Sequence, residues 1–183
     1  MPKNALIFLA EGFEEIEAVT CMDILRRAGI QVTVAGLNAG PLSGSRGICI
    51  TPDCDISLIT EEYDAYVLPG GGPGAANLAR SSQVKLLLQS AAQQNKIIAA
   101  ICAAPAVVLA PLGLLKDKLA TCYPQMEKEF PSDAKFIPKP VVVDHNLITS
   151  RGPATAMEFA LTIVEQLAGE NVRRQVAQAI LMI

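Results

Sequence analysis

Residues 97–110 read Ile-Ile-Ala-Ala-Ile-Cys-Ala-Ala-Pro-Ala-Val-Val-Leu-Ala, an apolar strand pattern that passes at Cys102 directly into a helical pattern. A strand that runs straight into a helix needs a sharp turn, and small residues on either side of the cysteine leave room for one. The pattern parallels the nucleophile elbow of hydrolases, with sulfur in place of the serine oxygen. Pro105 fits a first helical turn, where no N–H donor is needed. The stretch predicts a strand, a tight turn with a cysteine, and a helix.

Two interpretations of Cys102 follow from this position. A thiol at a helix N-terminus lies near a partial positive charge and free N–H groups, which favour the thiolate and lower its pKa. The alternative is a buried cysteine that fills space, as most free cysteines do. Because sites in parallel sheets lie at the carboxyl ends of strands, where Cys102 stands, we consider it a candidate nucleophile.

The rest of the chain alternates apolar, β-branched segments with helical patterns, which is typical of a parallel sheet covered on both faces. We expect strands at residues 5–10, 31–35, 65–68, 97–101, 119–122, 141–143 and 147–149. We expect helices at residues 16–28, 83–93, 103–110, 153–167 and 172–181. Residues 40–52 are glycine-rich and predict a loop with a short strand. The pattern as a whole predicts an α/β fold with a mostly parallel central sheet.

Length, charge and hydropathy exclude several classes of protein. A chain of 183 residues suits one domain, so we expect a single domain over residues 1–183. No apolar stretch approaches the ~20 residues of a membrane span, and the N-terminus lacks a basic region followed by a signal core. The net charge is −3 with scattered Lys and Arg, which argues against nucleic-acid binding. The expected location is cytoplasmic, with no membrane partner.

The cysteines and the single histidine limit the chemistry further. The five cysteines form no Cys-x-x-Cys pair, which argues against a disulfide framework or a structural zinc site. His145 lies between two apolar runs in Asp-His-Asn, which predicts a hairpin turn. One histidine excludes a multi-histidine metal site, so we expect no metal and assign acid–base chemistry to a carboxylate.

A glycine-rich loop, Leu-Pro-Gly-Gly-Gly-Pro-Gly-Ala at 68–75, follows the strand at 65–68. Its bare N–H groups, including those of Gly70 and Gly71, could bind an anion or an oxyanion. The loop loosely matches a dinucleotide fingerprint, but Pro73 removes one donor and no acidic residue ends a strand about 20 residues later. No Lys-Ser or Lys-Thr pair follows, so it is not a P-loop. A tight turn without a ligand is the alternative.

Two more loops belong to the same predicted sheet edge. Residues 11–17 carry four carboxylates at a helix start, where most serve as favourable helix-end charges. One of them could face the Cys102 sulfur, and in its protonated form it could donate a hydrogen bond to the thiolate. Thr-Ser-Arg-Gly-Pro at 149–153 is either an ordinary helix start or part of the site. We consider Arg27 and Arg46 surface or interface charges, available to pair with Asp23.

The assembled motifs resemble the ThiJ/PfpI superfamily, and within it the branch of bacterial YajL and the parkinsonism-associated protein deglycase. They are Glu-Gly-Phe-Glu-Glu-Ile-Glu at 11–17, Arg-Arg-Ala-Gly at 26–29, Val-Leu-Pro-Gly-Gly at 67–71, Ala-Ala-Ile-Cys-Ala-Ala-Pro at 99–105 and Thr-Ser-Arg-Gly-Pro at 149–153. The resemblance spans nearly the whole chain. It implies a flavodoxin-like three-layer α/β/α sandwich, a domain of the class I glutamine amidotransferase-like type, and a homodimer.

The resemblance also implies roles for residues. Cys102 would be the oxidation-sensitive nucleophile, and Glu17 the protonated partner of its sulfur. The oxyanion N–H groups would come from the glycine loop, chiefly Gly71, and from Ala103. Arg46 and Arg27 would lie near the dimer interface, with Arg46 able to approach the other subunit's site. Arg151 and Pro153 are placed at the site edge or interface.

The implied activities are those of glyoxalases and deglycases that act on methylglyoxal or its adducts, of oxidative-stress sensors and of chaperones. Where some relatives carry a histidine near the cysteine, this chain has Tyr123, which cannot act as a general base near pH 7 without a large pKa shift. The peptidases of the superfamily have a histidine directly after the cysteine, where Ala103 stands here. We therefore expect a cofactor-independent enzyme that acts on small dicarbonyl or glycated substrates, or alternatively a redox sensor or chaperone. Peptidase and thiamine-biosynthesis roles are disfavoured.

Overall fold

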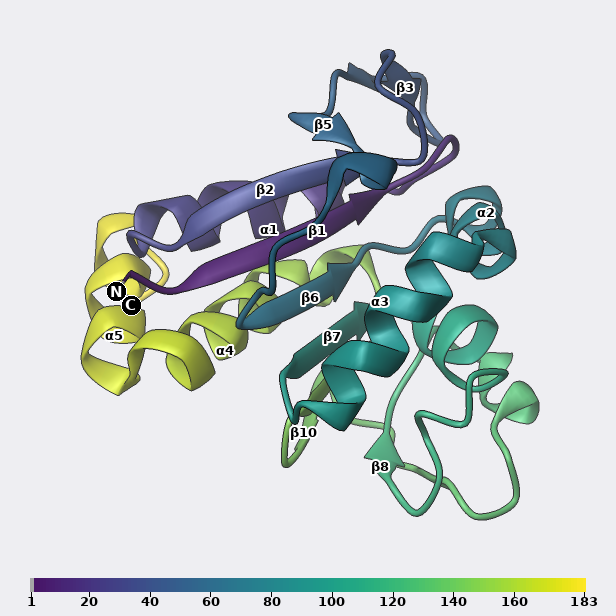
Figure 1. The fold of residues 1–183 in the computed structure, drawn as a ribbon. Coiled ribbons are helices and arrows are strands. Elements are labelled where there is room, and N and C mark those ends of the chain that lie inside the picture. Colours follow the sequence, from purple (N-terminus) through teal and green to yellow (C-terminus); the bar gives the residue numbers. More distant parts are fainter. Residues whose placement is uncertain (1) are drawn as a thin grey trace.

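A seven-stranded sheet runs through the centre of the computed structural model, which describes residues 2–183 (Figure 1). In spatial order the strands are β10 (Val141–Asp144), β11 (Leu147–Ser150), β7 (Ile97–Ile101), β6 (Ala65–Leu68), β1 (Asn4–Leu9), β2 (Gln31–Gly36) and β5 (Cys54–Asp55). Neighbouring strands are parallel except for the antiparallel pair β10 and β11. The predicted α/β fold with a mostly parallel sheet is confirmed.

Helices cover both faces of the sheet (Figure 1). On one face α1 (Glu15–Arg27) packs against α4 (Ala156–Ala168), which also contacts α5 (Glu170–Ala179). On the other face lie α2 (Gly72–Arg80) and α3 (Ser82–Gln93). Both ends of the chain lie on the side of the molecule remote from α2, near the start of β1 in the view of Figure 1.

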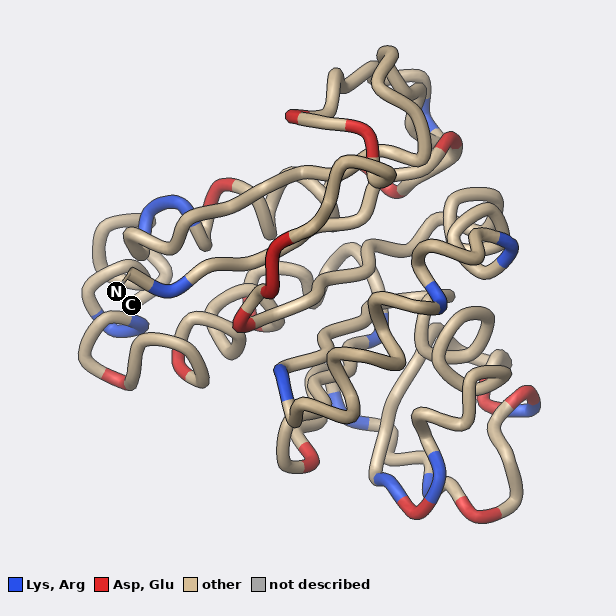
Figure 2. The backbone as a smooth tube through the Cα atoms, in the orientation of Figure 1, with Lys and Arg blue, Asp and Glu red and all other residues tan. Residues whose placement is uncertain are grey.

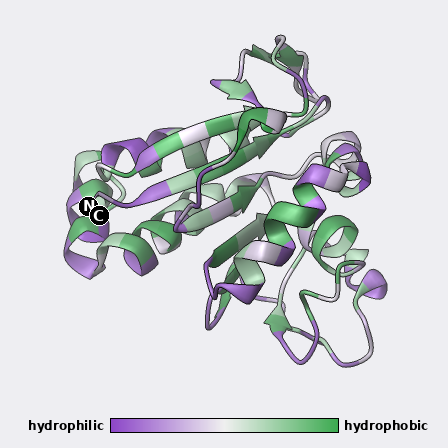
Figure 3. Ribbon diagram, viewed as in Figure 1, coloured by the Kyte–Doolittle hydropathy of each residue, from purple (hydrophilic) through white to green (hydrophobic). Residues whose placement is uncertain are grey.

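The central strands consist of apolar residues, which suits their burial by helices on both faces of the sheet. All four residues of β6 are buried, as are four of the five residues of β7. Continuous apolar runs are typical of parallel strands that have no solvent-exposed face. Figure 3 shows this contrast between the hydrophobic strands and the mixed surfaces of α4 and α5.

Short elements lie at the ends of the sheet. The pair β3 (Leu42–Ser43) and β4 (Cys49–Ile50) forms an antiparallel hairpin, in agreement with the predicted loop and short strand. A second small pair is β8 (Leu119–Ala120) with β9 (Lys135–Phe136). Single turns are η1 (Ile56–Leu58), η2 (Pro105–Leu109), η3 (Met126–Glu129) and η4 (Pro153–Thr155).

Several sequence predictions need correction. The helix expected at 103–110 is a single π-helical turn, in which the Ala110 N–H donates to the Pro105 carbonyl at 3.0 Å. The helix expected from residue 153 starts as the turn η4 and becomes α-helical at Ala156. The strand expected at 119–122 ends at Ala120. The hairpin turn at His145 is confirmed, with a φ of 55°.

Figure 2 shows Lys and Arg dispersed over many elements rather than gathered along one of them. Within residues 2–183 no helix has both the length and the apolar character needed to cross a membrane.

Candidate active site

Cys102 lies on a sharp turn directly after β7. Its φ is 65°, in the left-handed region that residues other than glycine rarely adopt, at a cost of order 1–3 kcal/mol. Two hydrogen bonds hold this conformation: the Cys102 N–H donates to the Ser150 carbonyl at 3.0 Å, and its carbonyl accepts from the Tyr123 N–H at 2.8 Å. The predicted strained turn is therefore present, fixed by β11 and by the segment after β8.

Glu17 lies in the first turn of α1 and is fully buried. The Gly70 N–H donates to its Oε2 atom at 2.7 Å. The Gly70 carbonyl in turn accepts from the Glu14 N–H at 3.0 Å, and the Glu14 carboxylate accepts from the Glu17 N–H at 2.8 Å. These three hydrogen bonds lock the start of α1 onto the glycine loop and aim the Glu17 carboxyl at Cys102.

The glycine loop allows this close approach. A Cβ atom at position 70 would lie 2.5 Å from the Cys102 Cβ and 2.7 Å from Glu17 Oε2. At position 71 the φ is +86°, and a Cβ atom would collide with the carbonyl oxygen of Gly12. The loop is thus more than a flexible turn, because it packs between α1 and the cysteine.

Burial dominates the electrostatics of the pair. It raises the pKa of Glu17 to about 7, against a lowering by the Gly70 N–H. Burial and the charge of Glu17 raise the pKa of Cys102 to about 12, although the N–H groups of Gly71 and Ala103 donate toward the sulfur. The lowered thiol pKa expected from a helix N-terminus is therefore wrong, since desolvation and the nearby carboxylate outweigh the N–H groups. Protonation of Glu17 removes the repulsive charge, so the two groups titrate as a coupled pair.

A cavity of about 600 Å³ opens over Cys102. The lining residues come from both sides of the site and include Gly71, Cys102, Ala103, Pro153 and Arg46. Gly70 and Glu17 lie beneath these lining residues. Arg46, expected to approach the other subunit's site, lines the cavity of its own chain.

The hairpin β3–β4 carries Arg46 to this position because Glu15 anchors it. The buried Glu15 carboxylate accepts hydrogen bonds from the Arg46 N–H at 2.5 Å, the Ser45 hydroxyl at 3.2 Å and the Ile48 N–H at 3.4 Å. Burial raises the pKa of Glu15, but these hydrogen bonds together hold it below its usual value. Glu15 is therefore a structural carboxylate, in contrast to Glu17.

Two predicted residues lie outside the cavity. Arg27 stands at the far end of α1 and pairs with Asp23 at 2.9 Å, so Asp23 finds one of the partners proposed for it. Arg151 lines an adjoining cavity of about 320 Å³ together with Pro153 and Tyr123. The structure thus brings Cys102, Glu17 and the backbone of the glycine loop together, and separates Arg27 from them.

Other residues of the cavity were not named from the sequence. Glu14, Ser45 and Met126 all line it. Glu14 and Ser45 stand within motifs already singled out, next to residues that were chosen. Met126 follows an irregular segment with no periodic pattern, so the sequence holds no signal for it.

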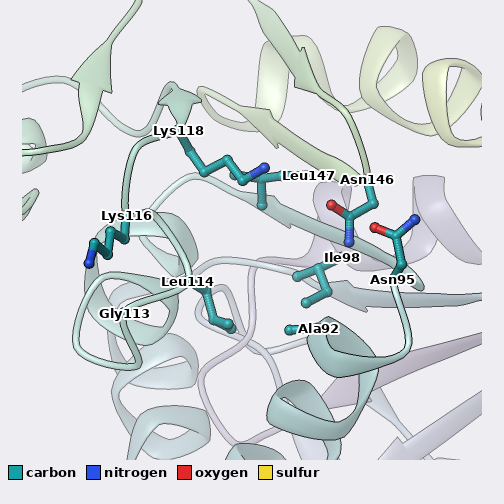
Figure 4. A pocket seen from close by; sticks show the side chains of 9 residues that line it. All are labelled: Ala92, Asn95, Ile98, Gly113, Leu114, Lys116, Lys118, Asn146 and Leu147. Carbon is teal, nitrogen blue, oxygen red and sulfur yellow. The ribbon is translucent and has the colours of Figure 1, made fainter.

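A separate cavity of about 300 Å³ lies at the opposite edge of the sheet (Figure 4). It is bounded by Ile98 and Leu147, near the amino ends of β7 and β11. Figure 4 shows the amide side chains of Asn95 and Asn146 next to each other on one side of it. Because catalytic groups in parallel sheets gather at carboxyl ends, the Cys102 cavity is the candidate active site. No group of three or more His, Cys, Asp or Glu side chains suited to a metal occurs in residues 2–183.

Comparison with known proteins assigns the family. The family model described as the DJ-1/PfpI family matches residues 3–166. The chain belongs to the DJ-1/PfpI family. The Drosophila melanogaster protein dj-1beta is 46% identical over 100% of this chain and 98% of its own length. The solved structure of oxidized Toxoplasma gondii DJ-1 superposes with a TM-score of 0.95 at 40% identity, covering 98% of each chain.

Within the DJ-1/PfpI family, one relative is named for an activity. The Caenorhabditis elegans glutathione-independent glyoxalase DJR-1.2 is 38% identical over 91% of this chain and 90% of its own length. The expected superfamily and fold are both confirmed by these comparisons.

Proposed function

We propose that this chain is a cofactor-independent glyoxalase that converts α-oxoaldehydes such as methylglyoxal to 2-hydroxy acids. The observation that carries the proposal is the pairing of Cys102, on a strained turn under an open cavity, with the buried Glu17 carboxyl. A relative named as a glutathione-independent glyoxalase supports it.

The chemistry follows from the groups around the sulfur. The Cys102 sulfur attacks the aldehyde carbon, and its proton passes through Glu17 to the new oxygen to give a hemithioacetal. The N–H groups of Gly71 and Ala103, which already face the sulfur, stabilise the developing negative charge on that oxygen.

Glu17 then moves a proton between adjacent carbons. Its carboxylate takes the proton from the former aldehyde carbon and returns it to the former ketone carbon. The hydroxyl proton of the hemithioacetal moves to the former ketone oxygen in the same rearrangement, which leaves a thioester of lactate on Cys102. Water cleaves the thioester, so that lactate leaves and the thiol is restored. A carboxyl with a pKa of about 7 suits both directions of transfer near neutral pH.

Adducts of methylglyoxal on amines or thiols are a second substrate class within the same proposal. The cavity of about 600 Å³ is large for a three-carbon aldehyde, which favours a deglycase role beside the glyoxalase role. Assembly as a homodimer is part of the proposal, because Ile16 and Val19 on α1 and Ile48 on the hairpin are exposed beside the site.

Lactate formation from methylglyoxal tests the proposal. Cys102→Ser and Glu17→Gln are each expected to lose nearly all turnover, and Cys49→Ser, at an exposed cysteine, is the matched control. Unchanged turnover in Cys102→Ser or Glu17→Gln would remove that residue from the mechanism. Near-native circular dichroism of each variant separates loss of chemistry from loss of fold.

A second candidate function is redox sensing through Cys102. The relative of known structure described as oxidized favours it. The N–H groups of Gly71 and Ala103 and a protonated Glu17 would hold the oxygens of a Cys102 sulfinate. Mass spectrometry after mild peroxide is expected to show a selective gain of two oxygens at Cys102. Equal oxidation of the exposed Cys49 would argue against this role.

A further inference from the structure

A second cavity adjoins the Cys102 cavity across a shared wall. Tyr123 and Pro153 line both of them, so the two cavities meet at these two side chains. The outer cavity has a volume of about 320 Å³. The two cavities, together called the groove, offer far more space than a three-carbon aldehyde requires.

The outer part of the groove is built for a flat, apolar group. Pro124, Pro140 and Pro153 line it beside the ring of Tyr123, which is 49% exposed. Gly152 lies beside this ring, where a Cβ atom would come into van der Waals contact with Tyr123 Cδ2 at 3.5 Å. Rigid proline rings and an accessible aromatic ring are surfaces on which a planar apolar substituent packs well.

A single positive charge stands in this outer part. The Arg151 N–H donates to the Pro140 carbonyl at 3.3 Å, which fixes the backbone. Within residues 2–183 the Arg151 guanidinium makes no side-chain hydrogen bond and no ion pair closer than 4.0 Å. The charges of Glu127 and Arg151 shift the pKa of the buried Cys122 in opposite directions, and the two side chains form no ion pair within 4.0 Å of each other. The guanidinium is therefore free to take a carboxylate, the anion whose geometry it fits best.

We propose that the substrate is an α-oxoaldehyde, or its adduct, with a flat, apolar substituent that ends in a carboxylate. The groove binds this substituent, which we call the arm of the substrate. This inference rests on the proposed function for the reacting end. Cys102 takes the aldehyde, the wall of Tyr123 and Pro153 packs on the arm, and Arg151 binds the terminal carboxylate.

Unreactive analogues of this arm test the inference without turnover. 4-Acetylbenzoate carries the aryl carboxylate and a ketone but no aldehyde, and acetophenone lacks the carboxylate. The readout is the concentration of each compound that halves the rate of iodoacetamide labelling at Cys102. For the wild-type protein, the half-protecting concentration of 4-acetylbenzoate is expected to be about tenfold lower than that of acetophenone. This factor corresponds to one charge-assisted hydrogen-bonded pair.

Arg151→Met is expected to lose this preference, and Arg151→Lys to keep only part of it. Arg174→Met, at an exposed arginine on α5, is the control and should keep the preference in full. Equal protection by both compounds in the wild type, or a preference that survives in Arg151→Met, would overturn the inference. The lactate assay on the same samples is independent, so a preference without turnover supports the groove and removes the glyoxalase proposal.

Discussion

The Gly70 N–H donates a 2.7 Å hydrogen bond to the Glu17 carboxylate, across 53 positions of sequence. This hydrogen bond joins the start of α1 to the glycine loop, directly beneath the turn that carries Cys102. Since Glu17 is fully buried, its charge is balanced by few other groups, and burial raises its pKa to about 7. This one backbone N–H thus links the packing of the site to its acidity, because it holds Glu17 against the loop and opposes the rise in pKa that burial causes.

Gly70→Ala is expected to destabilise the protein by about 1–3 kcal/mol, because the new Cβ would lie 2.5 Å from the Cys102 Cβ. Alkylation of Cys102 should change as well, since the side chain must shift. Gly72→Ala, in the same loop with open space around it, is the matched control and should leave stability nearly unchanged. Urea denaturation measures the stability of both variants. Equal stability of the two variants would contradict the tight packing around position 70.

Glu17→Gln is expected to stabilise the fold at alkaline pH. A carboxyl whose pKa rises from 4.5 in the unfolded chain to about 7 in the folded one costs stability as pH rises through this range. The loss approaches about 3 kcal/mol at pH 8, and the neutral amide avoids it. Denaturation at pH 5 and pH 8 should therefore show a falling stability in the wild type and a flatter response in the variant. A wild type that gains stability from pH 5 to 8 relative to Glu17→Gln would refute the raised pKa.

Glu15→Ala is expected to loosen the β3–β4 hairpin and to cost about 2–3 kcal/mol, because hydrogen bonds to a charged acceptor are lost. Glu15→Gln keeps an acceptor and should cost less. Hydrogen exchange at the Arg46 and Ile48 amides measures the effect, with the exposed Glu61→Ala as control. Unchanged protection of both amides in Glu15→Ala would show that the hairpin does not depend on this anchor.

Much of the fold could be predicted from the sequence because it rests on local patterns. The continuous apolar runs at 65–68 and 97–101 identified buried parallel strands with the bounds that the structure has. The helix α2 was given no bounds, since Gly72, Pro73 and Gly74 are poor helix formers. Contacts with the rest of the chain hold it instead, such as the hydrogen bond from the Gly74 N–H to the Gly12 carbonyl at 3.0 Å.

The site was only partly accessible from sequence. The strand-to-helix pattern pointed to Cys102, but only the family resemblance selected Glu17 among the four carboxylates at 11–17. The structure separates these carboxylates by their partners: Glu15 anchors the hairpin, Glu14 caps α1, and Glu17 faces the sulfur. The prediction of a lowered Cys102 pKa was wrong, because the pKa is set mainly by burial. Burial depends on the whole fold and not on the helix end alone.

The rate of iodoacetamide labelling at Cys102 as a function of pH tests most directly whether Glu17 controls the proton of the thiol. In a coupled pair, the thiolate with a protonated Glu17 keeps a constant ratio to the ionised Glu17 with a thiol. The wild-type rate should therefore rise with pH up to about 7 and then level off. Glu17→Gln should rise about tenfold per pH unit without this break. The exposed Cys49 serves as the internal reference. A wild-type profile that rises without a break from about pH 6 to pH 9, as in Glu17→Gln, would contradict the pairing of Cys102 with Glu17.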